Sequence, residues 1–356
     1  MSAGLHLYHY DLPPHLIAQS PVAERDRSRL LLLRRGLDSI AHHTFRELPA
    51  LLQERFPGGC LLVVNNTRVL PRRLFGSLPG GGALDALLVE EERPGLWRAM
   101  IRNARRIQPG MTLQFSGGEI SARAIERTGE GHWLLEFPDA GTLRKRLERH
   151  GMIPLPPYIR RDAGDAAQHE ADRGAYQTVF AAVDGAIAAP TAGLHFTPAV
   201  LDGLRSRDIA LAELTLHVGI GTFAKIQDED LSSHVMHREW FEIPQRTCAA
   251  IQEAKARRQP VIAVGTTTVR ALESWWREGR PDGFAGWSDL YIRPPFSFQV
   301  VDGLITNFHQ PRTTLMLMVS AFHGREHLLA AYGQAIGHEY RFFSYGDCMA
   351  ILPTGR

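Results

Sequence analysis

The chain has 356 residues, of which 44% are hydrophobic and 22% are charged, and its formal net charge is only +2. This composition is that of an ordinary globular protein and excludes collagen-like, coiled-coil and largely disordered chains. The longest apolar runs, such as Leu315 to Phe322, are far shorter than the roughly 18 residues that a membrane-spanning helix needs. The first ten residues lack the order of a signal peptide, so we expect a cytoplasmic protein without membrane contact.

The three cysteines, Cys60, Cys248 and Cys348, are odd in number and far apart in the sequence. This spacing excludes a disulfide framework and closely spaced thiolate zinc sites, so we expect all three to be buried as small apolar residues. His234 and His237 could share a metal ion if they lay on a helix, but the glutamate of a zincin motif and a nearby cysteine are both lacking, and no metal site is expected.

A short apolar segment, Cys60 to Val64, stops at Asn65 and predicts a buried strand followed by a polar loop. From residue 70 to about 149, short apolar segments alternate with glycine, proline and charged turns. Their spacing predicts a small antiparallel barrel or sandwich of five or six strands. These strands are expected at Leu84 to Glu90, Leu96 to Ile101, Thr112 to Phe115, Ile120 to Ile125 and His132 to Phe137.

Beyond this segment strands and helices alternate, which is typical of an α/β domain with a mostly parallel sheet. Strands are expected at 186–189, 209–216, 260–264, 289–292, 298–301 and 349–352, and helices at 199–206, 245–258, 269–278, 313–322 and 326–339. Because the Cys60 to Val64 strand precedes the barrel-like segment and its expected neighbours follow it, the barrel is an insertion. We therefore predict an α/β domain made of residues 1–69 and 150–356, and an inserted β-barrel domain made of residues 70–149.

Ligands of open α/β sheets bind outside the carboxyl ends of the strands, and four loops at such ends are unusually polar. The first is Asn65 to Arg68, which also has the composition of an ordinary turn. The second, Ala189 to Thr197, contains Thr191 and His195 and leads into a helix N-terminus, where an anion is favoured. His195 has the chemistry of a base, although a lone histidine is more often structural.

The third loop, Leu216 to Phe223, contains His217 but lacks the third glycine of a dinucleotide-binding fingerprint, and a bulged strand end explains it equally well. The fourth loop lies between a predicted strand and a predicted helix and suits a carboxylate or a phosphate. A threonine helix cap accounts for one of its threonines but not for the whole set. Its polar residues are Thr266, Thr267, Thr268 and Arg270.

The near-neutral charge means that any nucleic acid must be bound by local basic patches. Two candidate patches carry Arg102, Arg105 and Arg106 in the inserted domain, and Tyr158, Arg160 and Arg161 just after it. They combine positive charge with one aromatic ring, that of Tyr158, on which a base could stack. Clusters of charged residues are, however, usually only solvent-exposed surface without a binding role.

Taken together, several sequence strings resemble those of one protein family, and they extend over nearly the whole chain. The matching strings include Tyr10 to Pro13, Arg25 to Leu30, Val64 to Val69, Pro154 to Ile159, Tyr176 to Phe180, Ala188 to Thr197, Thr215 to Phe223, Val264 to Glu273, Leu304 to His309 and Tyr340 to Asp347. In these strings the chain resembles the S-adenosylmethionine:tRNA ribosyltransferase-isomerases of queuosine biosynthesis. It departs from the pattern at Arg72, Lys225-Ile226, Gln310 and Cys348.

The resemblance implies a transferase that moves the ribosyl part of S-adenosylmethionine onto a 7-aminomethyl-7-deazaguanine in the tRNA wobble position, with release of adenine and methionine. The α/β domain is then the catalytic domain, S-adenosylmethionine is a consumed co-substrate, tRNA is the partner, and a monomer without metal is expected. Such chemistry needs a neutral base, donors for developing negative charge and a dry pocket. Non-catalytic tRNA binding and methyl transfer are the rival hypotheses.

The same resemblance assigns expected roles to the polar loops. His195 and His217 are the candidate bases, and Asn307 and His309 are supporting donors. Arg270, with the threonine loop, is expected to hold the methionine carboxylate or a ribose oxygen. The remaining expected substrate-binding residues are Asn65, Thr67, Arg68 and Thr191, and the expected tRNA-binding residues are those of the two arginine patches.

Overall fold

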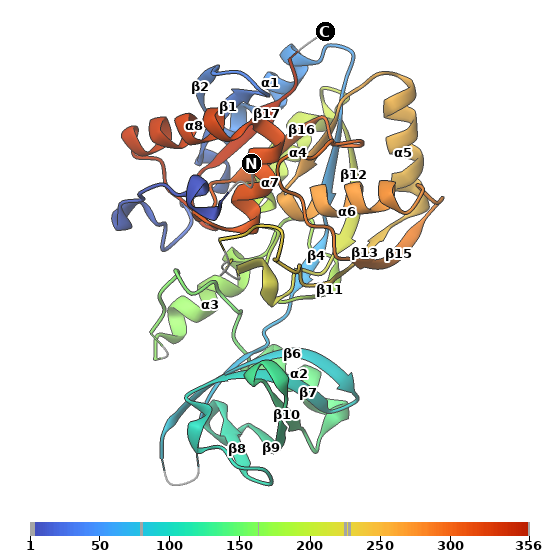
Figure 1. Cartoon of the computed structure of the whole chain (residues 1–356). Helices are drawn as coiled ribbons and strands as arrows, with labels where there is room; N and C mark the ends of the chain where they lie inside the picture. The colour runs from blue at the N-terminus through green and yellow to red at the C-terminus, as the bar shows by residue number, and fades with distance from the viewer. Residues whose placement is uncertain (1–3, 79–80, 163, 224–225, 227–228, 355–356) are drawn as a thin grey trace. The chain divides into compact units, whose positions relative to one another are not determined.

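The computed structural model describes residues 4–78, 81–162, 164–223, 226 and 229–354. Its internal contacts divide the chain into two compact units (Figure 1). The first unit consists of Met1–Arg68, Pro156–Ile159 and Gln177–Arg356, and the second of Val69–Leu155 and Arg160–Tyr176. The sequence prediction placed residues 150–176 in the larger domain, whereas the contacts of residues 150–155 and 160–176 assign them to the barrel unit.

A nine-stranded sheet forms the centre of the first unit. Its strands, in spatial order, are β15 (Phe284–Ser288), β13 (Glu239–Ile243), β12 (Ala210–Leu216), β3 (Leu61–Asn65), β14 (Val261–Val264), β16 (Gly303–Asn307), β17 (Cys348–Leu352), β1 (Arg29–Arg34) and β2 (Ile40–Thr44). The four strands β12, β3, β14 and β16 are parallel, as are β17 and β1, and the other pairs are antiparallel. The predicted α/β fold with a parallel central sheet is therefore confirmed.

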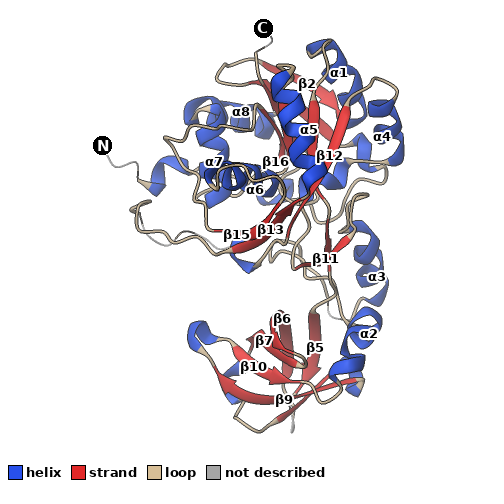
Figure 2. Cartoon of the chain, turned by 90° about the vertical axis from the view of Figure 1, so that its right-hand side faces the viewer, coloured by secondary structure: helices blue, strands red, loops and turns tan. Residues whose placement is uncertain are grey.

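Helices cover both faces of this sheet (Figure 2). Strands β3, β14, β16 and β17 are buried at every position, because side chains pointing to either face meet a helix layer. One apolar core joins alternate residues such as Leu62 and Val64 to helices α1 (Leu48–Arg55) and α4 (Pro198–Arg205). The other core joins Leu61 and Val63 to the remaining helices, which are α5 (Gln245–Ala256), α6 (Thr266–Arg277), α7 (Thr314–His323) and α8 (Arg325–Gly337).

The second unit is built around a closed antiparallel barrel, as the sequence predicts. Its strands, in order around the barrel, are β10 (Trp133–Glu136), β7 (Leu96–Arg102), β6 (Ala83–Arg93), β5 (Arg73–Ser77), β8 (Thr112–Phe115) and β9 (Ile120–Arg127). Helix α2 (Ala140–His150) adds Leu143 and Leu147 to the apolar barrel core. Helix α3 (Ala166–Ala175) is held by the ion pair between Arg161 and Asp172.

Several predicted elements of the first unit are wrong. The strands expected at 289–292 and 298–301 are not strands, and β15 and β16 lie instead at 284–288 and 303–307. The carboxylate of Glu273 accepts the N–H groups of residues 299–301, which are therefore unavailable for a sheet ladder. The strand expected at 186–189 ends at Ala186, as β11 (Val183–Ala186). The sequence patterns also missed β1, β2, β13 and the short β4 (Thr67–Val69).

The three cysteines are free and buried, as predicted. Within the ranges that the structure describes, no helix is long and apolar enough to cross a membrane.

Candidate active site

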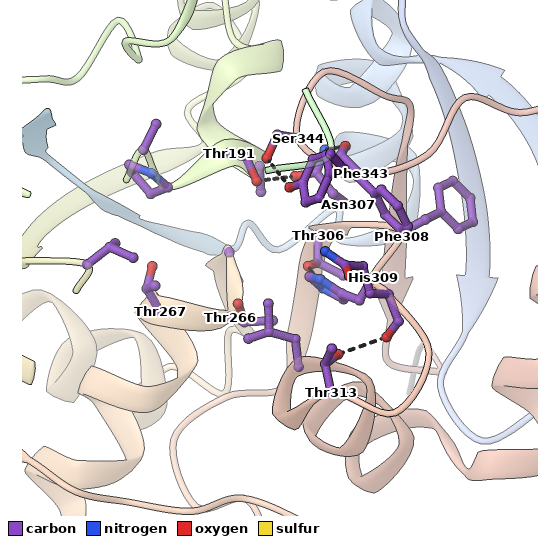
Figure 3. Close-up of a pocket in the computed structure, with 18 residues that line it drawn as sticks. Thr191, Thr266, Thr267, Thr306, Asn307, Phe308, His309, Thr313, Phe343 and Ser344 are labelled. Atoms are coloured by element: carbon purple, nitrogen blue, oxygen red, sulfur yellow. Dashed lines mark hydrogen bonds between the residues drawn. The ribbon is translucent and has the colours of Figure 1, made fainter. Parts of the chain in front are cut away.

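A cavity lies in the first unit at the carboxyl ends of the parallel strands β14 and β16 (Figure 3). The empty space, counted together with the open solvent at its mouth, is about 650 Å³. Its walls include six of the sequence-predicted site residues, namely Tyr158, Thr191, Thr266, Thr267, Asn307 and His309. The structure therefore brings together residues from three of the strand-end segments, which are far apart in the sequence.

The N-terminus of α6 opens onto this cavity. Gly265 has a φ of 91°, which favours glycine, and it provides no side chain to cap the helix. Thr266 and Thr267, the first helical residues, line the cavity, and the first-turn backbone N–H groups that a helix leaves without an intrahelical partner therefore lie at its wall. Such a terminus favours an anionic group through its N–H groups and the helix dipole.

Asn307 connects the cavity wall to His195. Its Nδ2 donates to the carbonyl oxygen of Phe343 and to Nε2 of His195, both at 3.2 Å. Its Oδ1 accepts from Thr191 Oγ1 at 2.9 Å, and Figure 3 shows Asn307 beside Thr191. Because a carbonyl oxygen can only accept, the Phe343 contact fixes the amide orientation and leaves Nε2 of His195 unprotonated. His195 is neutral and lies behind Asn307, outside the cavity lining.

Burial, with a smaller effect of Arg25, lowers the pKa of His195 to about 3. The Nδ1–H of this ring then donates to Ser28 Oγ at 2.7 Å. The imidazole therefore has both nitrogens engaged, which suits a residue that positions Asn307 better than a base in contact with substrate.

His309 does line the cavity. Its Nε2 is 2.8 Å from Thr306 Oγ1, its backbone N–H donates to the Tyr332 hydroxyl, and Tyr10 donates to its carbonyl oxygen. Burial lowers the pKa of the ring to about 3, so it is neutral at physiological pH. Its Nδ1 has no hydrogen-bond partner among the residues that the structure describes.

The first polar loop supports the cavity without lining it. Asn65 Oδ1 accepts from the N–H groups of Thr67 and Leu216, and Asn65 Nδ2 donates to Thr267 Oγ1 at 3.3 Å. Thr67 Oγ1 is 2.8 Å from Nδ1 of His217. Arg68 is half exposed and pairs with Asp184. These residues fix the strand ends beside the cavity, and His217 itself is not among the lining residues.

Two other predicted binding residues point elsewhere. Thr268 is fully buried, and its hydroxyl donates to the Val264 carbonyl oxygen of the preceding turn. Arg270 forms a buried ion pair with Glu239 at 2.5 Å and donates to the carbonyl oxygens of His237 and Ser288. The expectation that Arg270 holds a substrate carboxylate therefore has no support from its position, because its guanidinium is used to tie α6 to β13 and β15.

The predicted tRNA-binding residues are distributed over both units. Arg102, Arg105 and Arg106 are exposed on the barrel unit, where Arg102 is 3.5 Å from Asp85. Arg160 is exposed, but the Arg161 side chain is buried against Asp172 and is not placed for a phosphate. Tyr158 belongs to the cavity wall, where its hydroxyl bonds to Ser344 and its ring packs on Phe343. No group of three potential metal ligands occurs in the part of the chain that is described.

Sequence reasoning missed several polar or aromatic residues of the site, among them Ser28, Thr306, Phe343 and Ser344. Thr306 directly precedes Asn307 at the end of β16, so the polar cluster at this strand end was a usable signal. Ser28 reaches His195 from 167 positions away, and no local pattern reveals such a contact.

A parallel sheet with a polar cavity and an open helix N-terminus at its strand ends is the arrangement of an α/β enzyme. The family model for "Queuosine biosynthesis protein" matches residues 5–351. The chain therefore belongs to this family, and the resemblance seen in its sequence strings is confirmed.

Relatives from Rubrobacter xylanophilus and Thermosynechococcus vestitus are 47% and 46% identical to it. The alignments cover 98% and 99% of this chain and 97% and 96% of those proteins, which are both named S-adenosylmethionine:tRNA ribosyltransferase-isomerase. A crystal structure of an S-adenosylmethionine tRNA ribosyltransferase from Thermotoga maritima is 33% identical, with a TM-score of 0.55. That match covers 97% of this chain and all of the other.

Proposed function

We propose that the protein transfers the ribosyl part of S-adenosylmethionine to the aminomethyl group of a 7-deazaguanine base in the wobble position of tRNA, forming an epoxycyclopentanediol and releasing adenine and methionine. The observation that carries the proposal is the cavity, which combines the open N-terminus of α6 with the neutral imidazole of His309. The first-turn N–H groups of α6 suit the methionine carboxylate. The paired rings of Tyr158 and Phe343 offer an apolar surface for a purine ring.

The charge of the cavity favours the first chemical step. None of its described lining residues carries a carboxylate, an ammonium or a guanidinium group. A sulfonium cation in such a site is poorly solvated, and loss of a proton from the adjacent 5′ carbon neutralises it. Transfer of that proton to Nδ1 of His309 moves one positive charge instead of creating two opposite charges, which offsets part of the cost of protonating a buried imidazole.

His309 takes this role when its own proton is on Nε2 and is donated to Thr306 Oγ1. Nδ1, which has no hydrogen-bond partner among the described residues, can then accept a proton. Opening of the ribose expels adenine, the aminomethyl nitrogen attacks, and closure of the epoxide expels methionine. Asn307, fixed by His195 and Phe343, keeps Thr191 oriented at the cavity wall.

The test identifies what becomes of the co-substrate. Protein, chelator, S-adenosylmethionine and tRNA carrying the aminomethyl-deazaguanine are incubated together, and we expect equal amounts of adenine and methionine. S-Adenosylhomocysteine would instead show methyl transfer, and unchanged co-substrate with bound tRNA would show a binding module. Activity that disappears with chelator and returns with zinc or iron would contradict the metal-free mechanism. We expect a cytoplasmic monomer, which sedimentation analysis and cell fractionation test.

A further inference from the structure

One edge of the nine-stranded sheet carries a line of aromatic rings that the proposed chemistry does not use. His217 directly follows β12, Trp240 lies in β13 and Trp287 lies in β15. The rings of His217 and Trp240 are stacked, with centroids 5.1 Å apart and an interplanar angle of 19°. Trp240 and Trp287 are directly opposite each other in the antiparallel pair. We call these three residues the aromatic strip.

The aromatic strip lies on the face of β13 and β15 that is turned away from α6. Glu239 and Ser288 are on the α6 face, because they bond to Arg270 and Ser274 of that helix. Side chains alternate along a strand, so their neighbours Trp240 and Trp287 point to the opposite face. Trp287 is 51% exposed, which is high for the largest apolar side chain. Figures 1 and 2 show both strands at the sheet edge, beyond β12.

The strip is held rigidly and begins next to the cavity. Thr67 bonds to the His217 ring, and a Cβ on Gly185 would lie only 2.5 Å from that ring, so the β11 backbone packs closely against it. The His217 ring in turn supports Trp240. Val218, the residue after His217, lines the cavity. The strip therefore begins one residue along the chain from the cavity wall.

Guanidinium groups lie at both ends of the strip. The Arg238 guanidinium is 5.6 Å from the centroid of the Trp287 ring. Arg68, next to Thr67, is 49% exposed and forms an ion pair with Asp184. Open rings flanked by arginines are the features that bind single-stranded nucleic acid, since bases stack on rings and phosphates attract guanidinium groups.

We propose that the aromatic strip binds unpaired nucleotides next to the target base of the tRNA anticodon loop, with Trp287 and Trp240 stacking on their bases. The identity of the RNA rests on the proposed function. When the target base is drawn into the cavity, the bases on either side of it lose a stacking partner. The indole rings of the strip replace that partner.

The test measures binding of an anticodon stem-loop RNA without S-adenosylmethionine. Trp287→Ala is expected to weaken binding roughly 5- to 150-fold, the range for loss of one stacked base, while the slope of log affinity against log salt stays unchanged. Trp276→Ala is the matched control, because Trp276 on α6 is also exposed and also has an arginine, Arg280, over its ring. Its affinity is expected to equal that of the parent.

A second arm removes the base instead of the ring. With the parent protein, an abasic nucleotide beside the wobble position should weaken binding as Trp287→Ala does, and the combination should cost little more than either change alone. Equal affinity of Trp287→Ala and parent protein, or additive effects of the two changes, would overturn the proposal. Adenine release by the parent protein is assayed in parallel. If the parent releases no adenine, the proposed function is refuted. If the parent releases adenine but Trp287→Ala binds the RNA as tightly as the parent does, only the role of the aromatic strip is refuted.

Discussion

The side-chain amide of Asn307 donates to Nε2 of His195 at 3.2 Å, and this single contact fixes the protonation state of a buried histidine. We expect His195 to remain neutral, with its proton on Nδ1, from pH 8 down to about pH 5, because burial lowers its pKa to about 3. Nitrogen-15 chemical shifts of the ring measure this directly. A titration with a midpoint near 6.5 would contradict the arrangement.

His309 is the residue whose loss should affect the chemical step most. His309→Ala is expected to slow single-turnover adenine release by about 10²- to 10⁴-fold at saturating substrates, which is the usual contribution of a general base. His9→Ala, at an exposed histidine paired with Asp11, serves as the control. His195→Ala and His217→Ala are measured beside it, since both were nominated from the sequence. If His217→Ala alone abolishes release and His309→Ala stays within a few-fold of the parent, the base is His217.

These assignments show which part of the site the sequence predicts. The polar segments at the ends of β3, β12 and β14 lie where the sequence predicts them, because hydrophobic runs and threonine-rich or asparagine-rich ends are local signals, whereas residues 189–197 do not directly follow a strand. The roles were harder to assign: His195 and His309 both follow strands, yet only His309 lines the cavity. The difference depends on Ser28 and Phe343, which come from distant segments, and on whether a ring faces a neighbour or the cavity.

The fold was predictable to a similar extent. Five of the six barrel strands and the buried strands β3, β14 and β17 have simple apolar patterns and occur close to the predicted positions, whereas β5 was not predicted and β16 lies at 303–307 instead of 298–301. Strands β13 and β15 lie at the sheet edge and mix charged, aromatic and small residues, so period-two burial was not visible without knowing which face α6 covers. The position of Arg270 was not foreseen for a related reason, because its partner Glu239 is in one of these unpredicted strands.

Arg270 is expected to be a stability residue. Arg270→Met leaves the buried carboxylate of Glu239 without its partner, and loss of one member of a buried pair typically costs about 3–5 kcal/mol in the free energy of unfolding. Arg277→Met, on the same helix, removes a half-exposed pair with Asp289 and should cost at most about 1 kcal/mol. Urea unfolding measures both. Wild-type stability of Arg270→Met together with abolished S-adenosylmethionine binding would restore the ligand role.

Stability should fall as the pH drops from about 6.5 towards 4. Burial lowers the pKa of His323 to about 4 and those of His195 and His309 to about 3, so the unfolded chain binds protons in this range that the folded protein does not. Each such histidine contributes a slope of about 1.4 kcal/mol per pH unit between its folded and unfolded pKa values.

The contribution of one histidine is measurable by substitution. His323→Gln keeps an acceptor for the Gly36 N–H but cannot titrate. The free energy of unfolding, measured in urea between pH 5 and 6.5, should then fall less steeply with acid than that of the parent. Identical slopes would show that His323 is protonated in the folded protein.

The remaining prediction concerns the arginines of the barrel unit. Arg105 and Arg106 follow Asn103, whose φ of 61° turns the chain into a short exposed helical turn, and neither arginine has an ion-pair partner among the described residues. Because the net charge is only +2, tRNA affinity must come from such local positive charge. Replacing both by alanine should weaken tRNA binding and flatten the plot of log affinity against log salt by about 0.7 to 0.9 for each phosphate that the variant no longer neutralises.

Arg144→Ala is the control, since this exposed arginine of α2 pairs with Glu148. Trp287→Ala lowers affinity without changing the slope, so the two surfaces are separable in one salt titration. If the variant without Arg105 and Arg106 has the parent's affinity and slope, these arginines are solvent-exposed without binding tRNA, and the phosphates are bound elsewhere.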